Sequence, residues 1–149
     1  MNTCNTGIIS FFFYSVMMLD KEISQVIYRV YWKFVMEIQD FLIKLAQSPD
    51  TIDFNDTMAV IDSHYTFAPC AFRNGEHYNE SGQNAGSCKL FAFAQLHSLT
   101  QQQTLDCFGQ YYRHDVLKNP HGDDHQNIRN FITLGWEGIS FEDSPLTLI

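Results

Sequence analysis

A polar loop that delivers a cysteine to the start of a helix is the feature of this sequence best suited to chemistry. Residues 83–88 read Gln-Asn-Ala-Gly-Ser-Cys, and an apolar segment over residues 88–99 follows at once. Ser87 is a good N-cap for a helix that begins there. Free backbone N–H groups and the helix dipole at the first turn stabilise a thiolate, which lowers the pKa of a thiol. Cys88 is therefore a candidate nucleophile at neutral pH.

A histidine downstream could serve as the base for that nucleophile. His125 follows Cys88 in the chain, and Asn127 or Asp124 could orient its ring, which would complete a catalytic triad. This hypothesis describes a thiol hydrolase or acyl transferase with Cys88, His125 and Asn127 as catalytic residues. The alternative is a structural cysteine, because free cysteine is among the most buried residue types.

Several polar residues are candidates for binding rather than catalysis. Three arginines could line a site for an anion or a carboxylate, since the guanidinium group forms rigid bidentate pairs. The alternative is structural pairing of these arginines with Asp62 or Asp115. Polar residues also concentrate in the loops 74–86 and 125–130, where binding groups are commonly displayed. The predicted binding residues are Arg73, Asn74, Gln83, Asn84, Arg113 and Arg129.

Histidine and aspartate gather between residues 114 and 125, but their spacing does not define a metal site. Asp123 or Asp124 is expected to cap the last helix, and Pro120 and Gly122 keep His121 and His125 from sharing one helical face. The sequence therefore predicts no metal site and no cofactor. The residues considered as ligands are His114, Asp115, His121, Asp123, Asp124 and His125.

Composition limits the class of protein. The chain has 149 residues, of which 45% are hydrophobic and 15% aromatic, so it is a folded domain and not a disordered chain. Its formal net charge of −8 argues against nucleic acid as a partner, and we expect a protein or small-molecule partner instead. The 4 cysteines are widely spread and form no C-x-x-C pair, which favours a reducing, cytoplasmic location.

The N-terminal third has its own pattern. The apolar run over residues 7–19 is too short to span a bilayer, and it lacks the basic start and the cleavage site of a signal peptide. Residues 1–35 are therefore interpreted as an N-terminal extension, either a helical arm or a leader translated from an upstream start, before a domain over residues 36–149. From Asp20, apolar residues at three- and four-residue steps predict one long helix that ends at Ser48-Pro49.

Local signals predict the elements of the domain. Asp53 should cap a helix that starts at Phe54, and residues 65–72 should be extended before a turn at Asn74-Gly75. Residues 88–99 should form a central, buried helix. Thr100 and Gln103 form a capping box that starts another helix, with Gly109 as its weak point.

The end of the chain completes the expected fold. The last helix should place Ile128, Phe131 and Ile132 inward, and a short strand over residues 136–141 should pair with residues 65–72. The predicted fold class is α+β, mainly α, with about five helices around the central helix 88–99 and a short two-stranded β element.

The order of several short motifs resembles that of the HopJ family of type III effector proteins, from Met36 to about Phe141. The resemblance implies a small protein without a defining enzymatic activity, and delivery by type III secretion. The chain departs from the family pattern in its leader, at Ser81 and at His121. The motifs are Phe72-Arg73-Asn74-Gly75, Gly82-Gln83-Asn84, Gly86-Ser87-Cys88-Lys89, Phe108-Gly109, Tyr111-Tyr112-Arg113 and His125-Gln126-Asn127-Ile128-Arg129.

Overall fold

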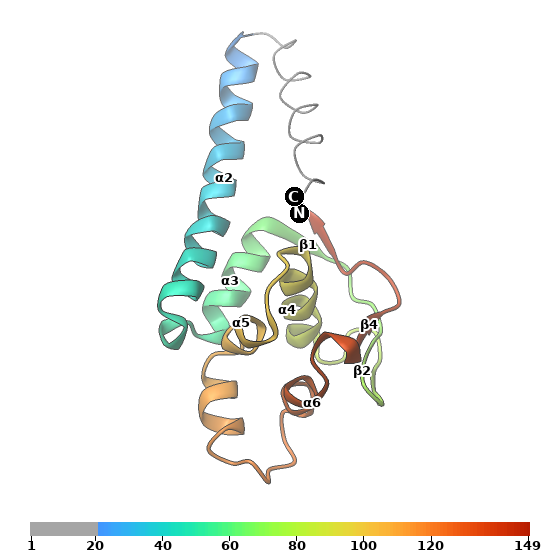
Figure 1. Cartoon of the computed structure of the whole chain (residues 1–149). Helices are drawn as coiled ribbons and strands as arrows, with labels where there is room; N and C mark the ends of the chain where they lie inside the picture. The colour runs from blue at the N-terminus through green and yellow to red at the C-terminus, as the bar shows by residue number, and fades with distance from the viewer. Residues whose placement is uncertain (1–20) are drawn as a thin grey trace. The chain divides into compact units, whose positions relative to one another are not determined.

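The computed structural model describes the backbone from Lys21 to Ile149, and the predictions made for residues 1–20 lie outside this part (Figure 1). The chain divides after Gln39 into two compact units. Helix α2 (Lys21–Gln47) continues across this boundary and ends before Ser48-Pro49, as predicted. Between residues 21 and 149, no helix combines the length and apolarity needed to cross a membrane.

The next elements follow local capping signals. A short 3-10 helix, η1 (Pro49–Thr51), leads into α3 (Phe54–His64), whose N-cap is Asp53 as expected. The Asp56 carboxylate accepts a hydrogen bond of 3.1 Å from the backbone N–H of Asp53. Because the side chain at N3 holds the cap residue, the start of α3 is firmly defined, and Phe54 sits at its first position.

The predicted central helix is confirmed, but it begins and ends three residues earlier than the expected range 88–99. Helix α4 (Ala85–Leu96) lies in the middle of the unit formed by residues 40–149, and six consecutive or nearly consecutive side chains in it are buried (Figure 1). Its N-cap is Asn84 and not Ser87, because the chain enters the helix through a left-handed conformation at Asn84 with φ 50°. Asn is one of the few residues that adopt this conformation readily.

Phe91 of α4 lies at the centre of the aromatic core. Its ring contacts rings from β2, from the turn after α5, from α6 and from the segment after α6, at centroid distances of 4.9 to 6.4 Å. Large aromatic side chains in such contacts dominate the energetics of a core. The four partner rings are Phe72, Phe108, Phe131 and Trp136.

The β structure differs from the predicted two-stranded ribbon of residues 65–72 and 136–141: residues 135–138 form a 3-10 helix, the strand after them begins at Ile139, and of the segment 65–72 only Phe72 pairs with it. Strand β1 (Tyr65–Phe67) pairs antiparallel with β5 (Leu146–Leu148). Strand β2 (Phe72–Asn74) lies between β3 (His77–Asn79) and β4 (Ile139–Phe141) in a second antiparallel sheet. The extended segment 65–72 is divided between two sheets because Pro69 cannot donate to a ladder. The α+β, mainly α fold class is confirmed.

The second half contains short helices. The Thr100–Gln103 capping box starts α5 (Gln101–Asp106) as predicted, and a π-helical segment, η2 (Tyr111–Val116), follows the turn at Gly109. The last elements are α6 (Gln126–Leu134) and the 3-10 helix η3 (Gly135–Gly138).

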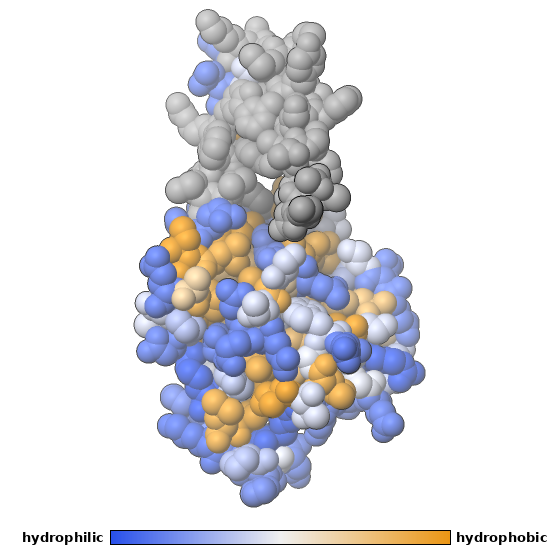
Figure 2. Space-filling view, in the orientation of Figure 1, coloured by the Kyte–Doolittle hydropathy of each residue, from blue (hydrophilic) through white to orange (hydrophobic). Residues whose placement is uncertain are grey.

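Two expectations for α6 are wrong. Its N-cap is His125 in a left-handed conformation, not Asp123 or Asp124, because Asp124 instead pairs with Arg129. Ile132 is 38% exposed rather than inward, while Ile128 and Phe131 are buried as predicted. On the face seen in Figure 2, such hydrophobic residues are interspersed with hydrophilic ones, which is normal for a folded domain.

Candidate functional site

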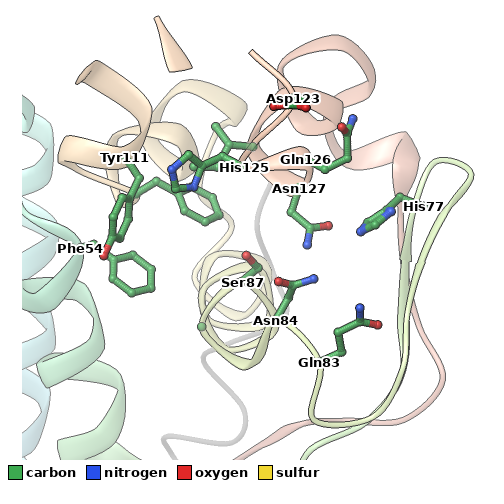
Figure 3. Close-up of a pocket in the computed structure, with 13 residues that line it drawn as sticks. Phe54, His77, Gln83, Asn84, Ser87, Tyr111, Asp123, His125, Gln126 and Asn127 are labelled. Atoms are coloured by element: carbon green, nitrogen blue, oxygen red, sulfur yellow. The ribbon is translucent and has the colours of Figure 1, made fainter. Parts of the chain in front are cut away.

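A cavity of about 530 Å³ opens where the amino ends of α4 and α6 meet (Figure 3). Loop residues before α4 and residues at the start of α6 line it, so the structure brings together the two polar loops singled out in the sequence. Four of the predicted site residues border the cavity, namely Gln83, Asn84, His125 and Asn127. Its size falls in the range of about 300–1,000 Å³ that is usual for small-molecule sites.

Both helices present unusual amino ends to this cavity. Asn84 and His125 have nearly the same left-handed backbone conformation, and neither side chain caps its helix. No acidic residue lies in the first turn of either helix. The first backbone N–H to bond inside α4 is that of Cys88, which donates to the Asn84 carbonyl over 3.0 Å. The preceding N–H groups are therefore left for other acceptors.

A network of asparagine amides holds the two loops together. Asn127 and Asn79 form a reciprocal pair: Asn127 Nδ2 donates to Asn79 Oδ1 over 2.8 Å, and Asn79 Nδ2 donates to Asn127 Oδ1 over 3.2 Å. Asn84 Nδ2 donates to the same Asn79 oxygen over 2.6 Å, and Asn74 Nδ2 donates to the Asn127 carbonyl over 2.7 Å. The network ties β2 and β3 to the start of both helices, so it fixes the shape of the cavity.

Replacing Asn127 with alanine should lower the free energy of unfolding by about 2 kcal/mol, because buried amide groups lose their partners. Urea denaturation followed by circular dichroism measures this loss. Asn55→Ala is the matched control, since Asn55 is exposed on α3 and should change stability by no more than about 0.5 kcal/mol. Equal effects of the two replacements would show that the network does not stabilise the fold.

One wall of the cavity is aromatic. The Phe54 ring stacks beside Phe108 at a centroid distance of 6.3 Å and meets Tyr111 edge-on at 5.2 Å. The Tyr111 ring in turn lies 5.1 Å from the His125 ring. Figure 3 shows Phe54 and Tyr111 on one side of the cavity, with His77 and Gln83 on the opposite side. The cavity therefore has an apolar side and a hydrogen-bonding side.

His125 is oriented by carboxylates, as the catalytic hypothesis required of a base. Its Nε2 lies 3.1 Å from Asp115 Oδ2 and 3.8 Å from Asp124 Oδ2. The nearer partner is thus Asp115, and Asn127 is engaged with Asn79 instead. Across residues 21–149, no three His, Cys, Asp or Glu side chains come together as a metal site.

The environment of Cys88 is the opposite of what a nucleophile needs. The thiol is buried, with 1% of the residue exposed, and burial raises the pKa of Cys88 to about 12. Its Sγ donates to the Cys70 carbonyl over 3.9 Å, and Ser87, not Cys88, borders the cavity. Loss of hydration thus outweighs the stabilisation that the helix start was expected to give the thiolate. The structure gives the Cys–His hypothesis no support.

The three arginines do not form a common anion site. Arg73 lies over the Tyr78 ring at 4.8 Å from its centroid. Arg113 donates to the Ile52 carbonyl over 2.8 Å and lies 3.4 Å from Asp53, which fixes the entry to α3.

Arg129 pairs with Asp124 at 2.6 Å and donates to the Asn119 carbonyl over 3.0 Å. None of the three lines the cavity. Arg113 and Arg129 therefore form structural ion pairs, which was the alternative to an anion site. Their partners are Asp53 and Asp124, not Asp62 and Asp115 as expected. Asp62 instead pairs with Lys89 at 2.7 Å.

Sequence reasoning missed several residues of the site. Asn79 and His77 lie in the polar segment after the Asn74-Gly75 turn, and their composition was the available signal. Phe54 and Phe108 carry no such signal, because an aromatic residue on a helical face is usually a core residue. Their place in the wall depends on packing between α3 and the turn after α5.

Comparison with known proteins gives a consistent result. The model of the HopJ type III effector protein family matches residues 38–146. A crystal structure of the protein of unknown function VPA0580 is similar, with 55% sequence identity and a TM-score of 0.74. That alignment covers 74% of this chain and 92% of the other. No curated protein matches the chain.

Proposed function

This chain belongs to the HopJ type III effector protein family, and from that premise we propose that it is a binding protein whose ligand is a small polar molecule held in the cavity between α4 and α6. The observation that carries the proposal is the cavity itself, which combines an aromatic wall with polar groups from two loops. A concave site of this kind with a few convergent polar groups is the usual form of a small-molecule site.

The cavity is also rigid enough to select a ligand. The asparagine network joins the strand β3, the loop before α4 and the start of α6 across distances of 2.6 to 3.2 Å. Groups held by other buried hydrogen bonds lose little freedom when a ligand binds, which favours affinity.

Replacing Ser87 with tryptophan tests the proposal, because a large ring at the start of α4 would fill the cavity. The full chain is titrated with small metabolites of varied chemical class while its backbone amide resonances are recorded. We expect at least one compound to shift the amides of Gly86, Ser87, Gln126 and Asn127. Ser87→Trp should weaken that binding by about tenfold or more, equivalent to about 1.4 kcal/mol.

The matched control is Ser140→Trp, which places the same ring on an exposed position of β4 outside the cavity. This variant should bind the compound as the natural chain does. If every compound that binds shifts only other resonances, or if Ser87→Trp binds as well as the control, the cavity is not the binding site.

A further inference from the structure

The charge of the cavity lining restricts its ligand. Among the described residues that border the cavity, none is Lys or Arg, and Asp123 contributes a carboxylate. The two helix amino ends would favour an anion, but no Arg or Lys side chain borders the cavity to pair with a phosphate or sulfate group, and the three arginines considered above are engaged elsewhere. The chain also carries a net charge of −8, which repels anions. A ligand without negative charge fits this lining best.

The polar side offers hydrogen-bonding groups that the protein does not use. Gln83 Oε1 accepts from the Glu80 N–H over 3.0 Å, so its Nε2 remains available as a donor. Asn84 Nδ2 donates to Asn79, so its Oδ1 remains available as an acceptor. Within residues 21–149, the Ser87 hydroxyl and the Asp123 carboxylate have no protein hydrogen-bond partner. The cavity therefore presents donors and acceptors side by side.

Such a mixture matches hydroxyl groups, because each hydroxyl both donates and accepts a hydrogen bond. The aromatic side adds a second requirement, since Tyr111 and Phe54 offer ring surface to an apolar face of the ligand. A sugar ring has both properties: its C–H groups form an apolar face and its hydroxyls surround it. A nucleobase is also flat and carries donors and acceptors on its edges, so a nucleoside is the competing ligand class that the test includes.

We propose that the cavity binds an uncharged saccharide of one or two rings. The sugar packs its C–H face on Tyr111, and its hydroxyls bind Gln83, Asn84, Ser87 and Asp123. This inference rests on the proposed function and names the chemical class of its ligand. The cavity volume of about 530 Å³ leaves room for a disaccharide.

The test titrates the full chain with glucose, galactose, mannose, cellobiose and lactose while backbone amide resonances are recorded. Adenosine and inorganic phosphate form the two comparison arms. At least one sugar should shift the amides of Ser87 and Gln126, and saturation transfer should reach the C–H protons of the sugar. Asp123→Asn and Tyr111→Ala should each weaken binding of that sugar by about tenfold, equivalent to about 1.4 kcal/mol.

Two further variants separate a binding role from a folding defect. Tyr111→Phe keeps the ring and should retain most of the affinity, whereas Tyr78→Ala removes an exposed tyrosine on β3 outside the cavity and should leave binding unchanged. If adenosine or phosphate shifts the cavity amides while no sugar does, the saccharide class is wrong and the cavity is still a binding site. If no sugar in the panel binds at up to tens of millimolar, the inference is overturned whatever the Ser87→Trp experiment shows.

Discussion

Cys88 should react with iodoacetamide at pH 7.5 about 1,000-fold more slowly than a free thiol, because the thiolate is the reactive species. Burial raises the pKa of this thiol from 9.0 to about 12. Well below both values, the thiolate fraction falls tenfold for each unit by which the pKa rises, so the raised pKa removes almost all thiolate at neutral pH. Limited access of the reagent to a side chain in the core should slow the reaction further.

Mass spectrometry of digested peptides measures the reaction at each cysteine of the native chain. Cys70 is the internal control, since it is only half-buried, and it should react faster than Cys88. Cys107 is a second buried thiol whose pKa burial also raises to about 12, and it should be as slow as Cys88. Modification of Cys88 before Cys70 would contradict the assigned environment and would return the thiol hydrolase hypothesis to consideration.

Replacing Gly109 with alanine should lower the free energy of unfolding by about 4 kcal/mol, combining backbone strain of about 1–2 kcal/mol with overpacking of about 1–3 kcal/mol. Gly109 has φ 59°, a conformation that costs an L-residue free energy. A Cβ at this position would lie 2.5 Å from the backbone N of Phe54 and 2.7 Å from Cα of Asp53. Backbone atoms at the start of α3 cannot move aside as a side chain can.

Gly82→Ala separates the two causes. Gly82 also has a positive φ, 85°, but a Cβ there would meet nothing within 4 Å. Gly82→Ala should therefore lower the free energy of unfolding through backbone strain alone, by about 1 kcal/mol. Urea denaturation followed by tryptophan fluorescence compares the two variants, and equal losses would refute the close contact between Gly109 and α3. Because that contact sets Phe54 beside Phe108, Gly109→Ala should also weaken ligand binding in the cavity.

Much of the fold follows from short-range signals in the sequence. Asp53 and the Thr100–Gln103 capping box mark the starts of α3 and α5 correctly, and the all-apolar character of residues 88–99 indicates the buried helix at the centre. These signals succeed because capping hydrogen bonds form between residues three positions apart. The polar loops that border the cavity were also recognisable from their composition.

The tertiary structure decided the features that depend on residues far apart in the chain. Asn84 and His125 occupy the N-cap positions of their helices in left-handed conformations, where local rules favour Ser87 and the aspartates. Asn84 is bonded to Asn79, and Asn79 to Asn127 of α6, so the starts of the two helices are joined by contacts between residues distant in the chain.

Sequence by itself determined the family, the mainly helical α+β class and the central helix, since periodicity and capping act over a few residues. Only the tertiary structure decided which polar groups face a cavity and which are consumed by structural bonds. Cys88 shows the reason: its position on α4 favours a thiolate, but burial of the thiol removes its hydration and raises its pKa. Hydration is a property of all the neighbours of a group, and those neighbours come from the whole chain.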